Sequence, residues 1–440
     1  MEKLIKFFTS KIKLIVLFYV LIQLILVFIS NVTYRSDSLY YYKLAQECIS
    51  LNEFYPAEKH LYEDYIVAPL YINVLIILLH IFNSTISVGL FNILIILAQL
   101  ILVYKITKKF FSEETAQLVV LLFVLYLNTP GMVLQNYTEL FFTLLITISL
   151  YLYSLKKNIY FLLSGVFIGA AIAVRPLGWG LLASIILIQI INSIKERKLH
   201  SEYSYIYIGS LLFILIFGGI IYSQFGKFEF TSTTGPVNLL IGANDDATGG
   251  FNATVHEQGK NGYIENSNQL TYIQKGEFYK AQAIKWIKEN PVKWLLLAPL
   301  KLLHAYSWDD IATSNLLGFN DTNFLRVLRI LFTEKDFEKA LPNTTTYEKV
   351  IYLSIMIISH LFYYFLLIAA AFGIYRMFRQ KTNNELISII LLFILLATIM
   401  LMITVGTPRY KYPMFILLLP FAASYIDMKF ALRKQKIVNA

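Results

Sequence analysis

Two carboxylates stand at the ends of long apolar segments. Asp37 follows the first such segment and precedes an aromatic run that begins at Tyr40, and Glu139 follows Tyr137 at the start of another. A carboxylate held at a membrane surface can deprotonate an acceptor hydroxyl or hold a cation. Each also has a structural interpretation, because Asp37 can cap a helix and Glu139 can favour a helix N-terminus. The sequence establishes no cofactor; if a divalent cation (Mg²⁺ or Mn²⁺) binds, these two candidate catalytic residues are its candidate ligands.

Three basic residues lie in short turns between apolar segments, where Lys and Arg are otherwise few. Arg175 is followed by a proline, and Arg409 and Lys411 lie between two prolines. A cation on the outer side breaks the orientation rule of membrane proteins and needs a compensating anion. A lipid phosphate would supply one, and Arg binds phosphate through two parallel hydrogen bonds. The pattern favours a lipid-phosphate site over side chains that reach up to lipid headgroups.

Four further residues are candidate substrate contacts. Tyr40, Tyr137 and Tyr410 adjoin the charged residues in sequence, and Asn244 lies with two aspartates in a glycine-rich stretch. That stretch could bind a sugar or a cation. Its spacing does not match a calcium loop, and its composition is also typical of a tight turn.

The composition is that of an integral membrane protein. Of 440 residues, 57% are hydrophobic and 15% are charged, against about 25% charged in soluble domains. Apolar runs near the roughly 20 residues needed to cross a bilayer recur along the chain, and in lipid such runs must be helical. The net charge of +10 comes from basic clusters between these runs, so it indicates membrane orientation rather than nucleic-acid binding.

Basic residues also predict which side each turn faces. Four lysines within the first 13 residues favour a cytoplasmic N-terminus. If the runs at 66–82 and 88–104 both crossed, the basic turn at Lys105 would lie outside, so we expect 66–82 to lie in the outer leaflet. The same parity argument makes 293–306 an interfacial helix. About ten spans then remain, with both termini cytoplasmic.

This topology divides the chain into three parts. Residues 1–222 form an N-terminal transmembrane catalytic module with a first outer loop at 31–87. Residues 223–350 form a large extracytoplasmic loop with interfacial helices, and 351–440 form a C-terminal transmembrane segment. The predicted fold is an all-α polytopic helical bundle with its candidate site on the extracytoplasmic face of the cell membrane.

At Asp37, Glu139, Arg175 and Arg409 the chain resembles the GT-C superfamily of membrane glycosyltransferases. It is most similar to the bacterial glycosyltransferase family 39-like group, which includes protein mannosyltransferases and aminoarabinose transferases. The similarities include Asp37 and the aromatic residues that follow it after the first span. They also include the motif Arg-Tyr-x-x-Pro near the end of the chain, which here begins at Arg409. One departure is Ser38, where many members carry a second acidic residue. The missing carboxylate argues against metal dependence.

The resemblance implies an inverting glycosyltransferase that takes its sugar from a polyprenyl-phosphate carrier. Asp37 would act as the base on a lipid, glycan or protein acceptor, and Glu139 would orient Asp37, the sugar or a cation. Arg175, Arg409 and Lys411 would neutralise the departing phosphate. The alternatives are a carrier or flippase for a lipid-linked glycan, and a structural membrane scaffold. A transporter should carry ionisable residues near mid-bilayer and internal repeats, whereas the candidate charges here gather at one face.

Overall fold

The chain folds into helices throughout the part that the structure describes. The computed structural model describes residues 10–30, 34–198, 200–319, 324–380 and 384–438, with side chains described up to residue 430. Within these ranges the β structure is limited to one isolated bridge between Gly250 and Gly406. Lys3 and Lys6, two of the lysines that predict a cytoplasmic N-terminus, lie outside the described residues. The predicted all-α fold is confirmed.

Seven helices in the described ranges are long and apolar enough to cross a bilayer. Their outward faces carry exposed side chains such as Phe28, Leu211 and Leu361, which are 61%, 56% and 64% exposed. Apolar surface on this scale is stable only when lipid covers it. The seven are α2 (Ile12–Ile29), α5 (Thr85–Phe110), α10 (Gly178–Glu196), α11 (Ser204–Phe225), α18 (Thr346–Arg379), α19 (Glu385–Ile403) and α20 (Tyr412–Val438).

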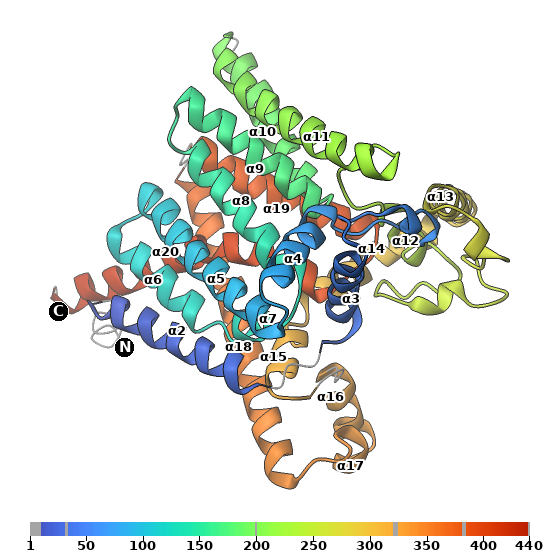
Figure 1. Ribbon diagram of the computed structural model, residues 1–440. Helices are drawn as coiled ribbons and strands as arrows, with labels where there is room; N and C mark the ends of the chain where they lie inside the picture. Colours follow the sequence, from blue (N-terminus) through green and yellow to red (C-terminus); the bar gives the residue numbers. More distant parts are fainter. Residues whose placement is uncertain (1–9, 31–33, 199, 320–323, 381–383, 439–440) are drawn as a thin grey trace.

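Three shorter helices occupy the other predicted spans. They are α6 (Glu113–Val124), α8 (Thr138–Tyr153) and α9 (Asn158–Val174). With the seven long helices they make ten, the number of spans predicted from charge parity, and the crossing of these three stays a prediction. Figure 1 shows α2 beginning and α20 ending at the same side of the bundle, as a chain with both ends on one side of the membrane requires.

Glycines let α9 and α11 pack backbone against backbone. A Cβ at Gly165 would lie 2.0 Å from the carbonyl oxygen of Ile206, and one at Gly209 would lie 2.1 Å from that of Leu162. Close approach through small residues is a common way for helices to associate in lipid, where no hydrophobic force drives them together. This contact holds the first half of α9 against α11, and Arg175 follows α9 as its C-cap residue.

The two segments predicted to lie at the membrane surface are short helices. They are α4 (Pro69–Ile81) and α14 (Pro291–Tyr306), with 13 and 16 residues. At about 1.5 Å per residue they reach roughly 20 and 24 Å, less than the roughly 30 Å of the hydrocarbon core. The spans assigned to α6, α8 and α9 are equally short, with 12, 16 and 17 residues. Length therefore does not distinguish the two groups, and the surface position of α4 and α14 stays a prediction.

The predicted outer loops fold into several small helices. Figure 1 shows α3 and the helices of the large loop gathered away from the ends of α2 and α20. A separate apolar core that includes Leu240, Tyr279 and Trp286 holds the large loop together. The remaining helices of the outer region are α3 (Ser36–Leu51), α7 (Asn128–Val133), α12 (Gly235–Ile241), α13 (Tyr272–Glu289), α15 (Ile311–Leu316), α16 (Phe324–Thr333) and α17 (Phe337–Ala340).

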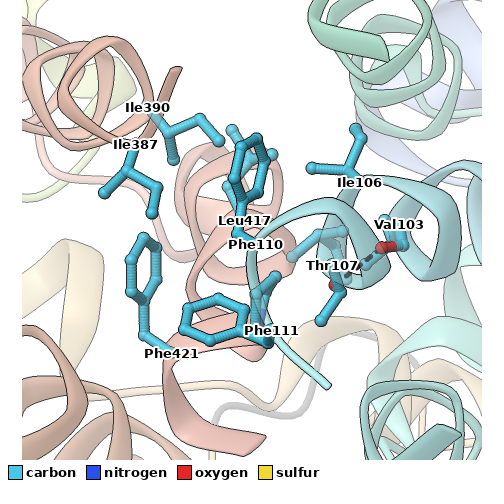
Figure 2. Close-up of a pocket in the computed structure, with 11 residues that line it drawn as sticks. Val103, Ile106, Thr107, Phe110, Phe111, Ile387, Ile390, Leu417 and Phe421 are labelled. Atoms are coloured by element: carbon cyan, nitrogen blue, oxygen red, sulfur yellow. Dashed lines mark hydrogen bonds between the residues drawn. The ribbon is translucent and has the colours of Figure 1, made fainter. Parts of the chain in front are cut away.

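A small apolar pocket lies inside the bundle between α5, α19 and α20 (Figure 2). Phe110, Ile387 and Phe421 line it, and it encloses about 20 Å³, enough for roughly one water molecule. Pro420 interrupts α20 at its wall, and a proline inside a helix bends it. The pocket is a packing gap beside that bend and is too small for a substrate.

Candidate active site

A cavity of about 870 Å³ lies among the outer elements. Its walls come from the start of α3, the start of α8, the turn between α9 and α10, the loop around α12, the end of α14, and the 3-10 helix η5 (Pro408–Lys411). Six of the nine predicted site residues line it: Asp37, Tyr40, Tyr137, Arg175, Arg409 and Tyr410. The remaining three, Glu139, Lys411 and Asn244, do not.

Asp37 lies in the first turn of α3 with its carboxylate against Arg409. The Arg409 Nη2 donates a hydrogen bond to Asp37 Oδ2 across 372 positions of sequence. The residue at the N-cap of α3 is Arg35, so Asp37 does not occupy the capping position that its structural interpretation requires. The Asp37 side chain is 42% exposed, and a ligand in the cavity can therefore reach it.

A hydrogen-bond clamp holds the start of α3 against the start of α8. The backbone N–H of Asn136 donates to the hydroxyl of Ser38 at 2.6 Å, and the Asn136 amide donates to the carbonyl of Ser38 at 3.3 Å. Tyr71 of α4 donates to Asn136 Oδ1 at 2.7 Å. Because all three residues are buried, the clamp fixes Asp37 relative to Tyr137 and Glu139.

Glu139 lies beneath the cavity rather than on its wall. Its side chain is 2% exposed, and its Oε1 lies 2.7 Å from Arg175 Nη1 and 3.9 Å from Arg409 Nε. One carboxylate oxygen thus faces both guanidinium groups. A buried charge requires such partners, because desolvation without them would be very costly.

The structure brings Arg175 and Arg409 together, and each guanidinium stacks on an aromatic ring. Arg175 lies 4.3 Å from the ring centre of Tyr410, and Arg409 lies 4.3 Å from that of Tyr137. Both arginines are mostly buried, with 16% and 12% of their side chains exposed. The two carboxylates and two guanidiniums form a charge-balanced cluster, which we call the ion cluster: Asp37, Glu139, Arg175 and Arg409. The compensating anions that the sequence argument required are thus present within the protein.

Glycines also set the position of Arg409. A Cβ at Gly406 would lie 2.0 Å from the carbonyl oxygen of Lys301, and one at Gly242 would lie 1.7 Å from that of Thr404. The backbone N–H of Gly406 donates to the carbonyl of Gly249 at 2.9 Å. The glycine-rich stretch after α12 therefore packs directly on α14 and on the turn that leads into η5.

Lys411 is placed away from the cavity. Its ammonium group lies 3.1 Å from Asp309 Oδ1, both side chains are 1% exposed, and it donates to the carbonyls of Trp308 and Pro408. All three N–H donors of a lysine therefore have partners in the protein. We leave Lys411 out of the proposed phosphate site, because its geometry ties η5 to the loop before α15.

Asn244 is likewise engaged in local structure. Its amide donates to the carbonyls of Leu240 and Ile241 at 2.9 Å, and its side-chain oxygen accepts from the N–H of Asp246 at 2.8 Å. It is buried and caps the end of α12 while forming a turn. We leave it out of the proposed substrate contacts.

Several polar residues of the cavity wall were not predicted. Asp310, Asn315 and His304 line it, as does Tyr65. Burial raises the pKa of Tyr65 to about 12, with Asp37 adding to the rise, so its hydroxyl keeps its proton. Burial also raises the pKa of the Asp310 carboxyl, while a hydrogen bond from the Phe324 N–H opposes the rise.

One signal for this part of the wall was present in the sequence. Two adjacent acidic residues, Asp309 and Asp310, follow Trp308 directly after the interfacial helix. Such a pair at the end of an apolar segment resembles the pattern that identified Asp37 and Glu139. Asp309 anchors Lys411, while Asp310 faces the cavity.

The ion cluster does not fit a divalent cation. A Mg²⁺ or Mn²⁺ ion takes about six oxygen ligands, and the described residues contain no group of three or more acidic, His or Cys side chains able to hold a metal. Glu139 is covered by two guanidiniums, and Asp37 is paired with Arg409.

The comparisons with known proteins concern sequence and fold separately. Residues 67–222 match the family model described as dolichyl-phosphate-mannose-protein mannosyltransferase. This segment contains Glu139 and Arg175, whereas Asp37 and Arg409 lie outside it. No curated protein matches the chain by sequence.

Two similar crystal structures are of the oligosaccharyltransferase of Archaeoglobus fulgidus. The one tethered with an acceptor peptide containing the NVT sequon has a TM-score of 0.51 and 13% identity, covering 97% of this chain and 50% of that one. The one in complex with Zn and sulfate has a TM-score of 0.49 and 14% identity, covering 95% and 49%. The present chain thus spans about half the length of that enzyme, and identity this low shows likeness of fold alone.

The resemblance predicted from the sequence is confirmed on both counts. The family match covers residues 67–222, from within the first outer loop to near the end of α11, and the tethered-peptide structure shares its fold with nearly the whole chain. The chain is a membrane protein, all-helical in the part that the structure describes, with a fold like that of the Archaeoglobus fulgidus oligosaccharyltransferase.

Proposed function

We propose that this protein transfers a sugar from a polyprenyl-phosphate carrier to an extracytoplasmic acceptor. The observation that carries the proposal is the placement of Asp37. Its exposed carboxylate shares the wall of a large outer cavity with two arginines that come from distant parts of the chain. A base and phosphate-binding cations in one cavity are what transfer from a phosphate-linked sugar requires.

Asp37 has the geometry of a general base. Its Oδ2 accepts a hydrogen bond from Arg409, which leaves Oδ1 to accept a proton. The acceptor hydroxyl would give its proton to Asp37 as its oxygen bonds to the anomeric carbon of the sugar. The bond from that carbon to the phosphate oxygen breaks on the opposite face, so the configuration inverts and the polyprenyl phosphate departs with the negative charge.

Arg175 and Arg409 supply positive charge for the phosphate. Among the described residues, Arg175 forms its hydrogen bonds to Thr138 and Glu139 through Nη1, and a guanidinium has five N–H donors. The remaining donors are available to phosphate oxygens, and hydrogen bonds between two charged groups are about twice as strong as neutral ones. In this proposal Glu139 orients the two arginines and does not touch the substrate.

The tyrosines of the cavity would contact the sugar. Tyr40, Tyr65, Tyr137 and Tyr410 all line it, and aromatic rings with a hydroxyl offer both an apolar face and a hydrogen-bonding group. The wall from the large loop, which includes Asn238 and Thr248, would face the acceptor. The acceptor is a lipid, a glycan or a protein, and the cavity faces the extracytoplasmic side.

Mass analysis of cell-envelope glycans from cells with and without the protein tests this function. The proposal predicts that one glycoconjugate loses a single sugar residue in the absence of the protein, while the corresponding polyprenyl-phosphate sugar accumulates. An unchanged glycan profile would contradict transfer, and loss of the sugar with the lipid-linked donor trapped on the inner leaflet would indicate a flippase.

A further inference from the structure

The ion cluster places an arginine between two carboxylates that come from different elements. Asp37 belongs to α3 and Glu139 to α8, and Arg409 of η5 contacts both. Its Nη2 pairs with Asp37 Oδ2, and its Nε lies 3.9 Å from Glu139 Oε1. A divalent cation shared by these two carboxylates would have to occupy the volume that the Arg409 guanidinium fills.

We propose that Arg409 acts as a built-in cation at this place, and that the protein transfers its sugar without a divalent metal bound to Asp37 and Glu139. This inference rests on the proposed function for its catalytic part. Its structural part, the exclusion of a metal by the guanidinium, stands on the contacts alone.

The charges around the cluster support the exclusion. Arg175 lies 2.7 Å from the same Glu139 oxygen that Arg409 approaches, so the two negative charges are already balanced by two positive ones. A doubly charged ion would have to approach both guanidiniums in a mostly buried setting, where repulsion is weakly screened.

The stacking of Arg409 fixes it in this position. Its guanidinium lies 4.3 Å from the ring centre of Tyr137, which adds a cation–π interaction to the two ionic contacts. Tyr137 is buried and precedes Thr138 at the start of α8. The guanidinium therefore cannot swing away from Glu139 without leaving its ring.

Ser38 provides a separate observation on the ligands. It follows Asp37 directly, is completely buried, and accepts a hydrogen bond from the Asn136 N–H. Its hydroxyl is committed to the clamp between α3 and α8, so it does not join Asp37 as a metal ligand. Ser38, next to the proposed base, therefore has a structural role, which is to hold α3 against α8.

The consequence for the reaction is that the charge beside Asp37 is permanent. A guanidinium stays protonated at every pH at which the protein is folded, and it cannot be removed by a chelator. The positive charge beside Asp37 is then present whatever the concentration of divalent ions around the protein.

Sugar transfer by the purified protein, with and without EDTA, tests the catalytic part. The rate from a polyprenyl-phosphate sugar should agree within about twofold in 5 mM EDTA and in 5 mM Mn²⁺, since no step is assigned to a metal. A loss of tenfold or more in EDTA that Mn²⁺ restores would overturn the proposal. Absence of transfer under all conditions would instead contradict the proposed function.

Mn²⁺ binding followed by electron paramagnetic resonance tests the structural part without any need for activity. The wild type and Asp37→Asn should give the same titration, because no ion is held by Asp37. Arg409→Ala should gain one Mn²⁺ site, and the double variant with Asp37→Asn should lose it. The control Arg379→Ala, at the exposed far end of α18, should gain none.

Two results would overturn the structural part. One is a Mn²⁺ site in the wild type that disappears in Asp37→Asn, and the other is an Arg409→Ala protein that gains no site although it remains folded. If Arg409→Ala does not fold, Arg409→Lys serves in its place. It keeps the charge and should, like the wild type, show no Mn²⁺ site that depends on Asp37.

Discussion

Replacing Glu139 with Gln should destabilise the protein far more than the same change at an exposed ion pair. The Glu139 carboxylate lies 2.7 Å from Arg175 and 3.9 Å from Arg409. At an effective dielectric constant of about 20 these contacts contribute roughly 6 and 4 kcal/mol of gross Coulomb attraction. Desolvation of the buried charges offsets much of this, and breaking a buried pair typically costs about 3–5 kcal/mol. We expect the lower end, about 3 kcal/mol, because Gln keeps the shape and one acceptor oxygen.

The activity should fall as well, because both arginines lose their shared anchor. Misplacement of a catalytic group by about 1 Å can cost on the order of 10² in rate, so we expect a loss of about 10- to 100-fold in sugar transfer. Thermal unfolding in detergent measures the first effect, and transfer from a polyprenyl-phosphate sugar measures the second.

Glu113→Gln is the matched control. Glu113 lies 2.7 Å from Lys108, the same separation as in the buried pair, but the two side chains are 38% and 56% exposed. Exposed pairs contribute about 0–1 kcal/mol, so this variant should unfold close to the wild-type temperature and keep its activity. If Glu139→Gln were no less stable than Glu113→Gln, the reasoning from burial and charge would be refuted.

Three further predictions concern other parts of the chain. Lys411→Met should destabilise the protein by about 3 kcal/mol, because it leaves the buried Asp309 carboxylate without its cation. In a double-mutant cycle, adding Asp309→Asn should recover part of the stability and activity. Burial lowers the pKa of Lys301 from 10.5 to about 8. The unfolded chain therefore binds more protons between these values, and stability should rise by up to about 3 kcal/mol from pH 8 to 10.5 in the wild type but not in Lys301→Met. With Cys48 replaced by Ser, Lys108→Cys should react with membrane-impermeant thiol reagents only from the cytoplasmic side.

Each of these has a clear contrary outcome. If the double change at Lys411 and Asp309 is no better than the single one and donor affinity alone is lost, Lys411 binds the phosphate directly. If the free energy of unfolding changed with pH above 8 in the same way for the wild type and for Lys301→Met, burial would not lower the pKa of Lys301. Labelling of position 108 from outside the cell would reverse the predicted topology.

The spans were predictable because lipid imposes one solution on the backbone. Continuous apolar runs of the required length must be helical, and the run at 88–104 lies within α5. Charge parity alone separates α4 and α14 from the spans, because α6, α8 and α9 are of similar length, and the surface position of these two helices stays a prediction. The small helices of the large loop were not predicted one by one, because their short turns depend on contacts with distant segments.

The site was predictable in composition and less so in connectivity. Asp37, Arg175 and Arg409 were selected because each is a charge at the edge of a span, and the structure brings them together. The ion-pair partner of each residue could not be predicted from the sequence, because pairing depends on how deeply each side chain is buried in the folded protein. Lys411 and Arg409 look alike in sequence, yet two residues along a turn put one against buried Asp309 and the other in the cavity.

The turnover of Asp37→Asn on a polyprenyl-phosphate sugar tests the central claim most directly. Asn has the shape of Asp but cannot accept the proton, and loss of a general base typically costs about 10²–10⁴ in rate. The matched control is Asp64→Asn, a carboxylate on the wall of the same cavity that is 59% exposed and lies 3.1 Å from Lys275. We predict a loss of at least about 100-fold for Asp37→Asn, with donor binding and unfolding temperature near wild type, and nearly full activity for Asp64→Asn. Turnover of Asp37→Asn within about twofold of the wild type would contradict the assignment of Asp37 as the base.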